Sequence, residues 1–420
     1  MDGLVYPDRR PHTGLIEYKN VLRPARVVEA DVKKGLFTIW NTLDFTNLQD
    51  AIRMVYTVRQ NGRDVYTADV PAELLDIAPH ARKEIALPLP EGLTGPYAVH
   101  FSEYRLMADA LVPADHLVGE DEAGCQEYAA PVMAESTAPV TVKETPRHLI
   151  LTGENFRYVY NKTTAAFDEM VYGGRTLLTR PMGWNIWRAP TDNDRNIARD
   201  WYGKHYHYRY GRGYTPTLTQ QDGGWLIEAD LAIVTAYLPA VVRGKVKWLV
   251  KPNGEIALTC DAERRQQDPF LPRFGLRLFL PRAMEQITYF GYGPWESYID
   301  KRRSSFRHLH SAKVTDLHED YLKPQENGSH YACTMVQAAD ADVMLQVTGE
   351  SFSFSASPYT QEELTQKKHN FELERCDATV LCVDAFQSGI GSNSCGPALA
   401  EAYRVPREMH FECTFSVFVK

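Results

Sequence analysis

Short runs of alternating apolar and polar residues, closed by tight-turn signals, constrain the fold of this chain more than any other feature. Residues 52–58 place an apolar side chain at every second position, Asn61-Gly62 follows, and residues 65–70 resume the pattern. A period of two marks a strand with one buried face, and both residues of Asn-Gly tolerate the positive φ that a hairpin turn needs. The sequence therefore predicts a β-hairpin here.

The same arrangement recurs at residues 246–259, where Pro252-Asn253-Gly254 separates two further strand-like runs. Helical periodicity is weak, and residues 361–369 are the best short helix candidate. Many short strands between turn signals are typical of β-sandwiches, so we predict an all-β protein. The other strand candidates are residues 36–40, 98–104, 156–160, 226–234, 275–280, 342–348 and 411–419.

Length and composition exclude several classes of protein. A chain of 420 residues has room for two or three domains at roughly 100–200 residues each. The 46 basic and 54 acidic side chains give no reason to expect nucleic-acid binding, which needs a basic face. No apolar run is long enough to span a membrane or to act as a secretory signal. The seven cysteines are odd in number and lack a Cys-x-x-Cys pair, so we expect reduced thiols in a cytoplasmic protein.

Two composition shifts suggest where the domains begin and end. Residues 1–20 are rich in Pro, Arg and Gly and lack alternation, which predicts a tail or connector. Residues 135–139, Glu-Ser-Thr-Ala-Pro, have the composition of a linker. These shifts predict a sandwich of Ig-like size at 21–138 and a larger β domain after it, at about 144–420.

Two His-x-His pairs, His205/His207 and His308/His310, are candidates for metal binding. On a strand, residues i and i+2 lie on one face, which suits two ligands of one metal ion. No third ligand stands at a characteristic spacing, so ordinary histidines beside Tyr and Arg are the more common explanation. We therefore predict no metal site from these pairs.

Acidic residues gather in two places. Asp192-Asn193-Asp194 follows Pro190 in a predicted loop, where it can bind a cation or sugar hydroxyls, or cap its own backbone amides. Glu296 and Asp300 form a pair of the kind that glycoside hydrolysis needs, one as acid and one as nucleophile or base. Carboxylates beside Lys301 and two arginines are more often structural ion pairs, so we favour that role for them.

Five segments, in order along the chain, match the pattern of one enzyme family. They are Gly3-Leu-Val-Tyr-Pro-Asp-Arg-Arg-Pro-His12, Trp187-Arg-Ala-Pro-Thr-Asp-Asn-Asp194, Gly291-Tyr-Gly-Pro-Trp-Glu-Ser-Tyr298, Tyr321-Leu-Lys-Pro-Gln-Glu-Asn-Gly328, and Ser388-Gly-Ile-Gly391 followed by Cys395-Gly-Pro397. Together they resemble the C-terminal part of bacterial β-galactosidases of glycoside hydrolase family 2. One such segment is a weak signal, whereas five in order are highly specific.

The resemblance implies an all-β architecture in which an Ig-like β-sandwich at 21–138 precedes a large antiparallel β supersandwich at 144–420, the small-chain-like domain. Residues 1–20 correspond to the exit from the catalytic barrel. In the family, the two catalytic glutamates of the retaining mechanism lie on that barrel, and their motifs do not occur in this sequence. We therefore expect no catalytic residue in this chain, and no hydrolysis of β-galactosides by the chain alone.

The resemblance also implies partners. A barrel-bearing catalytic portion, or a separate large subunit, would complete the enzyme, with a galactoside as substrate and a homo- or hetero-oligomer as the assembly. Complete family members commonly use magnesium and sodium, but mainly through residues of the barrel, so no cofactor is expected in this chain. Two other interpretations remain open: an independent carbohydrate-binding module, and a purely structural or oligomerisation domain.

In the family, loops of the last domain reach the barrel mouth and shape the sugar site. By resemblance, Asp192, Asn193 and Asp194 form one such loop and are candidates for substrate contact. A Trp that stacks on sugar aligns here with Cys395, which removes the stacking surface at that position. The resemblance therefore implies that another aromatic residue supplies the contact, or that it is lost.

Overall fold

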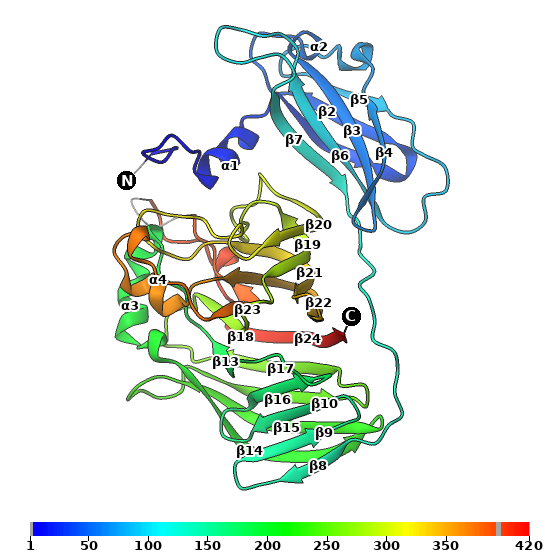
Figure 1. Cartoon of the computed structure of the whole chain (residues 1–420). Helices are drawn as coiled ribbons and strands as arrows, with labels where there is room; N and C mark the ends of the chain where they lie inside the picture. Colours follow the sequence, from blue (N-terminus) through cyan, green and yellow to red (C-terminus); the bar gives the residue numbers. More distant parts are fainter. Residues whose placement is uncertain (1–2, 392–395, 420) are drawn as a thin grey trace. The chain divides into compact units, whose positions relative to one another are not determined.

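A computed structural model describes residues 3–391 and 396–419, and the chain divides into two compact units (Figure 1). The first unit comprises residues 1–129 together with 292–295 and 302–309, and the second comprises 130–291, 296–301 and 310–420. The strands of both units pair in antiparallel sheets, so the predicted all-β class is confirmed. None of the helices in the described residues combines the length and the hydrophobicity that a membrane crossing needs.

The first unit is an Ig-like β-sandwich. A three-stranded sheet, in the order β1-β2-β5, and a four-stranded sheet, in the order β4-β3-β6-β7, share one apolar core. Phe37 of β2 and Phe101 of β6 meet edge to face in this core, with ring centroids 5.1 Å apart. The elements are α1 (Thr13–Val21), β1 (Ala25–Asp31), β2 (Leu36–Asn41), α2 (Leu48–Ala51), β3 (Ile52–Gln60), β4 (Arg63–Asp69), β5 (Arg82–Ala86), β6 (Tyr97–Arg105) and β7 (Leu117–Gly124).

The predicted hairpin at Asn61-Gly62 is confirmed. Strands β3 and β4 pair antiparallel on either side of this dipeptide, and both turn residues have a positive φ, 50° and 71°. The apolar residues that alternate along β3 are the ones that the fold buries: Ile52, Met54, Tyr56 and Val58. A local period of two was therefore sufficient to place this strand and its inward face.

Residues 13–21, most of them in the segment predicted as a tail or connector, form helix α1. The two residues that this helix buries, Thr13 and Asn20, are polar rather than apolar. The Asn20 side chain donates to the carbonyl of Glu120 (3.0 Å) and accepts from the amide of the same residue (2.7 Å). An apolar-periodicity argument cannot detect a helix that is held by hydrogen bonds rather than by an apolar stripe.

Helix α1 also organises the distant segment 302–309. The Glu17 carboxylate accepts hydrogen bonds from the backbone amides of Arg302 (3.1 Å), Arg303 (2.8 Å) and Ser304 (2.8 Å). Farther along this segment, the Phe306 ring lies edge-on to the His100 ring at 4.6 Å. The segment therefore completes the first unit, although almost 180 residues of chain separate it from that unit's last strand.

A buried carboxyl group of β6 lies beside the start of β1. Glu103 of β6 is only 1% exposed, and its Oε2 accepts from the backbone amide of Ala25 at 3.0 Å. Its Oε1 has no hydrogen-bond partner among the described residues. The opposite position on β7 is Gly119, where a Cβ would lie 3.0 Å from Oε2 and 2.3 Å from the Cβ of Arg23. Burial raises the pKa of Glu103 to about 8, against the opposing effect of Ala25 and Arg23.

Residues 135–139, predicted as a linker, are part of the second unit. The division falls after residue 129, and residues 130–140 run without regular structure before β8. Gln346 donates to the carbonyl of Pro131 (2.8 Å), and Asn253 donates to the carbonyl of Ala134 (3.1 Å). Side chains of the second unit thus hold the chain just before residues 135–139.

The second unit contains two antiparallel sheets around a single large core. A five-stranded sheet has the order β12-β11-β10-β9-β8, and a twelve-stranded sheet follows the path β13-β18-β23-β22-β24-β17-β16-β15-β14, with β19, β20 and β21 branching from it. Aromatic residues join the two sheets: Phe167 of β11 meets Trp248 of β16 edge to face at 5.2 Å. This large antiparallel arrangement agrees with the predicted supersandwich.

The predicted strand regions of the second unit all overlap observed strands, and the helix expected near 361–369 is α4, followed by a short 3-10 turn. The strands are β8 (Thr141–Glu144), β9 (His148–Thr152), β10 (Phe156–Asn161), β11 (Ala166–Tyr172), β12 (Arg175–Thr176), β13 (Arg180–Asn185), β14 (Tyr210–Gln221), β15 (Gly224–Val234), β16 (Val242–Val250), β17 (Ile256–Arg264), β18 (Arg273–Pro281), β19 (Gln286–Gly293), β20 (Phe306–Lys313), β21 (Ser329–Ala339), β22 (Val343–Ser357), β23 (Ala378–Gln387) and β24 (Glu408–Val419). The helices are α3 (Ile197–Gly203) and α4 (Gln361–Gln366).

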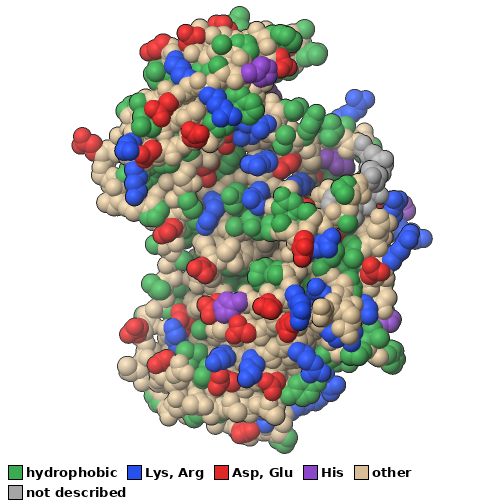
Figure 2. Space-filling model, turned by 180° about the vertical axis from the view of Figure 1, so that it is seen from behind, with side chains coloured by type: hydrophobic (Ala, Val, Ile, Leu, Met, Phe, Trp, Pro, Cys, Tyr) green, Lys and Arg blue, Asp and Glu red, His purple; other side chains and the backbone are tan. Residues whose placement is uncertain are grey.

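Charges of both signs are mixed over the surface. Figure 2 shows Lys and Arg side chains interspersed with Asp and Glu on the face turned toward the viewer, without a continuous basic stripe. Phosphate backbones bind to clustered basic residues, so this face does not have the character of a nucleic-acid interface.

Candidate functional site

An ion pair between Arg188 and Asp194 lies at the centre of the candidate site in the second unit. Nε and Nη2 of Arg188 donate to the two carboxylate oxygens of Asp194 at 3.0 and 2.7 Å, and both side chains are buried. The Asp194 carboxylate also accepts from the amide of Thr191 at 2.9 Å, which completes a capping box on the 3-10 helix Asp192–Arg195. Burial disfavours the charge of Arg188, but Asp194 outweighs it and raises the Arg188 pKa.

Arg188 connects this loop to a second one, 388–391. Its Nη1 donates to the carbonyl of Ser388 at 2.5 Å, and its Nη2 donates to the carbonyl of Gly389 at 3.0 Å. The Asn193 amide donates to the carbonyl of Ile390 at 2.7 Å. Two of the segments picked out in the sequence are therefore bonded to each other, although almost 200 residues separate them.

A third segment holds the opposite edge of the same loop. The Asp300 carboxylate accepts from the backbone amides of Ile390 (3.1 Å) and Gly391 (2.7 Å). A Cβ at Gly389 would lie only 2.4 Å from the Asp300 carboxyl carbon, so only glycine fits there. Side chains thus fix the backbone of 388–391 on both edges, and the Ser-Gly-Ile-Gly sequence is explained by this close approach.

Behind these loops lies a buried network of charges around Arg273. The guanidinium donates to Asp384 (3.0 Å from Nε) and to Glu326 (3.1 Å from Nη1), and all three residues are buried. Burial raises the pKa of both carboxyls, against the opposing effect of Arg273. The amide of Glu326 also donates to the carbonyl of Ala189 at 2.9 Å, which ties the segment 321–328 to the Arg188 loop.

Glu296 is a structural anchor and does not have the environment of a catalytic acid. Its carboxylate accepts from Lys301 (2.7 Å), from the hydroxyl of Tyr321 (2.6 Å) and from the amide of Gly328 (3.0 Å). Burial alone would raise its pKa, but these three partners outweigh burial and lower it to about 2. A general acid needs a proton to give, whereas this group stays ionised and fully bonded.

The three candidate residues of the first loop have different environments. The carboxylate of Asp194 is occupied by Arg188 and Thr191, and Asn193 is occupied by Ile390. Asp192 faces solvent, and its side chain, 57% exposed, pairs with Lys323. Asp192 therefore has the more accessible of the two carboxylates, while substrate contact by all three residues stays a prediction. The fourth candidate, Cys395, lies outside the described residues.

Neither His-x-His pair assembles a metal site. His207 packs against Trp187, with ring centroids 5.5 Å apart, and its pKa is lowered by burial. His308 lies 3.3 Å from the side-chain nitrogen of Gln126. Within residues 3–391 and 396–419, no group of three or more His, Cys, Asp or Glu side chains is arranged to hold a metal ion.

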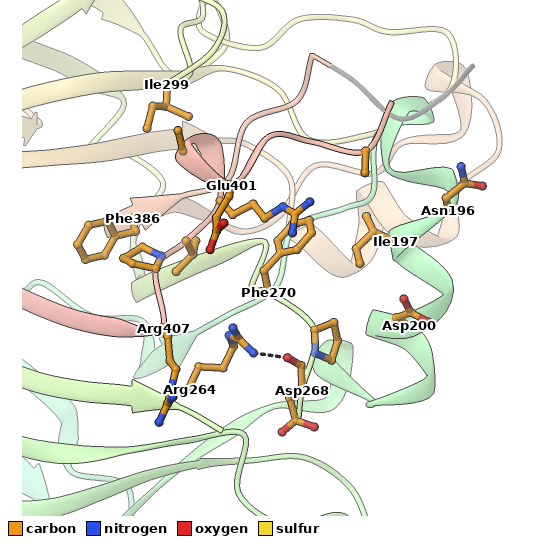
Figure 3. Close-up of a pocket in the computed structure, with 16 residues that line it drawn as sticks. Asn196, Ile197, Asp200, Arg264, Asp268, Phe270, Ile299, Phe386, Glu401 and Arg407 are labelled. Carbon is orange, nitrogen blue, oxygen red and sulfur yellow. Dashed lines mark hydrogen bonds between the residues drawn. The ribbon is translucent and has the colours of Figure 1, made fainter. Parts of the chain in front are cut away.

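A cavity of about 930 Å³ adjoins the two loops, and sequence patterns did not reveal it (Figure 3). One side comes from Asn196, Ile197 and Asp200, directly after the Asp192–Arg195 helix, and the other from residues 398–407, after the 388–391 loop. Phe270 and Arg264 also line it. These residues are far apart in the sequence and belong to no motif, so only the folded chain brings them together.

Comparisons with known proteins identify the class to which this arrangement belongs. The β-galactosidase small-chain family matches residues 152–416, and a family described as β-galactosidase domain 4 matches residues 37–126. The chain therefore belongs to the β-galactosidase small-chain family.

Individual relatives agree with the family match. A β-galactosidase of Actinobacillus pleuropneumoniae is 36% identical over 99% of this chain and 41% of its own length. A β-galactosidase of Staphylococcus xylosus is 33% identical over 99% of this chain and 42% of its own length. This chain thus spans about two fifths of the curated relatives that it matches. Among solved structures, a putative aldose 1-epimerase from Escherichia coli K12 aligns with 67% of this chain and 100% of its own, at 6% identity and a TM-score of 0.34.

Proposed function

We propose that this chain is the C-terminal, non-catalytic part of a β-galactosidase of glycoside hydrolase family 2. In this proposal the complete enzyme hydrolyses terminal β-D-galactosides by the retaining mechanism, and both catalytic glutamates lie on a barrel that these 420 residues do not contain. The observation that carries the proposal is the small-chain family match over 152–416, together with relatives of which the chain covers only about 41%.

The contribution of this chain would be to position loops. Buried ion pairs and backbone contacts hold the loops 188–194 and 388–391 against each other. Preformed loops lower the entropic cost of assembling a sugar site, because they need no ordering when substrate binds. In the assembled enzyme these loops would border the sugar, with Asp192 available to accept hydrogen bonds from its hydroxyls.

Reconstitution is the direct test. The portion of the Actinobacillus pleuropneumoniae β-galactosidase that this chain does not match would be expressed alone and mixed with this chain, and hydrolysis of an aryl β-galactoside would be measured. We expect each partner alone to be inactive and the mixture to be active. Sustained hydrolysis by this chain alone, purified from a host without β-galactosidase, would contradict the proposal.

A loop variant adds a matched control to the reconstitution. Asn193→Ala removes the hydrogen bond to Ile390, whereas Asn155→Ala changes an amide outside the loop cluster. If the loops shape the sugar site, the first variant raises KM in the reconstituted enzyme and the second leaves it unchanged. Equal kinetics for both variants would assign the chain a purely assembling role.

Metal ions, location and assembly are further parts of the proposal. Complete family members commonly use magnesium and sodium, and we assign those sites mainly to the barrel-bearing portion. A reducing, cytoplasmic location is supported by the six described cysteines, all of which are free thiols. The partner would be the barrel-bearing portion or a large subunit, in a homo- or hetero-oligomer.

A further inference from the structure

The cavity beside the 388–391 loop has the size of a ligand site. Its volume of about 930 Å³ is near the upper end of the 300–1,000 Å³ range of small-molecule pockets. Figure 3 shows the side chains of Glu401 and Phe270 near its centre, with Asn196, Ile197 and Asp200 of the α3 region on one side and Phe386 on the other. The cavity belongs entirely to the second unit.

The charged groups that line the cavity are balanced and partly unpaired. Three acids, Asp200, Asp268 and Glu401, face three arginines, Arg264, Arg404 and Arg407. Asp268 pairs with Arg265 and Lys204, and Arg407 pairs with Glu263. The other four lining charges, Asp200, Glu401, Arg264 and Arg404, form no ion pair with any described residue. The two arginines are partly engaged, since Nη1 of Arg264 donates to the carbonyls of Arg265 and Asp268, and Nε and Nη2 of Arg404 donate to the carbonyl of Leu399. Nη2 of Arg264 and Nη1 of Arg404 are left as further donors, beside the two carboxylates.

These four groups discriminate between classes of ligand. Asp200 and Glu401 can only accept hydrogen bonds, and Arg264 and Arg404 can only donate them. An anion would be repelled by one pair and a cation by the other. A hydroxyl group both donates and accepts, so a neutral polyhydroxylated ligand can satisfy all four.

Flat apolar surfaces complete the pattern. Phe386 is partly exposed, and none of the ring contacts among the described residues involves it, so its faces are not covered by another aromatic ring. The Arg404 guanidinium lies over Phe270 at 5.0 Å, which adds a planar group to the wall. Aromatic and guanidinium planes suit the apolar C–H face of a pyranose ring, with its hydroxyls directed to the acids and arginines at the edge.

We propose that this cavity is a second, non-catalytic saccharide site that binds a neutral pyranoside such as galactose or a galactose-containing disaccharide. The choice of galactose rests on the proposed function, whereas the cavity and its charges do not. The cavity-lining segment 398–407 is bonded to the 388–391 loop, because the amide of Gly389 donates to the carbonyl of Tyr403 at 2.8 Å and the amide of Val405 donates to the Ser388 hydroxyl at 2.9 Å. A bound sugar would therefore brace that loop. The site is open to solvent, so the expected affinity is in the millimolar range.

The test uses the full 420-residue chain without any barrel-bearing partner. Isothermal titration and saturation-transfer NMR with galactose and with lactose would measure binding. Glu401→Ala and Asp200→Ala each remove one acceptor from an exposed side chain and should weaken binding about tenfold, the usual effect of losing a hydrogen bond to a charged group. Phe386→Leu keeps an apolar side chain but removes the flat face, and should weaken binding as well. Glu408→Ala changes an exposed acid outside the cavity and should leave binding unchanged.

Three outcomes would overturn the proposal. They are the absence of saturable binding through the millimolar range, equal binding by all the variants, and binding of inorganic phosphate or a simple amine in preference to galactose. The proposed function fails by a different result, since reconstituted hydrolysis does not enter this experiment. If the chain binds sugar but does not reconstitute activity, the saccharide site is supported and the proposed catalytic partner is contradicted.

Discussion

Replacement of Glu103 by Gln should make the first unit more stable at neutral and alkaline pH, but not at acidic pH. Burial raises the pKa of Glu103 to about 8 from its usual 4.5. Between these two values the folded chain holds a proton that the unfolded chain has released, so the free energy of unfolding falls as pH rises. Gln resembles the protonated acid and has no charge to bury, so the variant avoids this loss.

The size of the effect follows from the two pKa values. Their difference corresponds to about 5 kcal/mol over the whole range, of which about 3 kcal/mol is lost by pH 7. Domains are typically stable by about 5–15 kcal/mol, so this single carboxyl would decide how the first unit behaves at alkaline pH. Burial also raises the pKa of the neighbouring Glu122, to about 7, so part of the pH dependence remains in the variant.

Hydrogen–deuterium exchange is the suitable assay, because it reports on the two units of the full chain separately. Protection of β6 and β7 amides would be measured from pH 5 to pH 9 and corrected for intrinsic exchange rates. The wild type should lose protection with rising pH more steeply than Glu103→Gln, while a control, Glu29→Gln on exposed β1, should follow the wild type. Parallel curves for all three proteins would refute the argument from burial.

Three further outcomes follow from the second unit and the thiols. Glu296→Gln should destabilise the second unit at pH 7 by up to about 3 kcal/mol, because the wild-type pKa is lowered to about 2. Urea unfolding should show that this loss of stability shrinks as the pH falls from the usual pKa of 4.5 toward 2. Gly389→Ala should cost about 1–3 kcal/mol in the same assay, because its Cβ would meet the Asp300 carboxyl at 2.4 Å, whereas Gly183→Ala has open space and should be nearly neutral. Of the described thiols, exposed Cys125 should react first with a thiol reagent, followed by mass spectrometry, whereas buried Cys382 should resist because its pKa is raised to about 11.

Local patterns predicted the strands well, because the information for a strand lies in its own residues. The alternation of 52–58 and the Asn61-Gly62 turn placed β3, its inward face and its hairpin partner. Helix α1 was missed because it buries Asn20 rather than an apolar stripe, and the partners of Asn20 lie about 100 and 283 residues away. Contacts between residues so far apart produce no periodic pattern in the sequence.

The candidate site was predicted only in part, because its contacts also join residues far apart in the sequence. The segments around Asp194 and Ser388 stood out by resemblance, but nothing in the spacing indicated that Arg188 bonds both loops. The sequence also did not reveal that Asp300 is the acceptor for the amides of Ile390 and Gly391. The cavity walls come from segments without any motif, so their convergence depends on the topology of the twelve-stranded sheet.

The return of residues 302–309 to the first unit has a consequence for how the protein is made. A ribosome delivers residues 1–129 early, but Glu17 has no amides to accept from until residues 302–304 have emerged. At about 5–20 residues per second, the intervening 180 residues take roughly 10–40 seconds to synthesise. During that interval the Glu17 carboxylate lacks these three amide partners, although Asn20 can already bond to Glu120. A truncation after residue 129 would make this transient state permanent, so an excised N-terminal unit should be a poor substitute for the same unit in the complete chain.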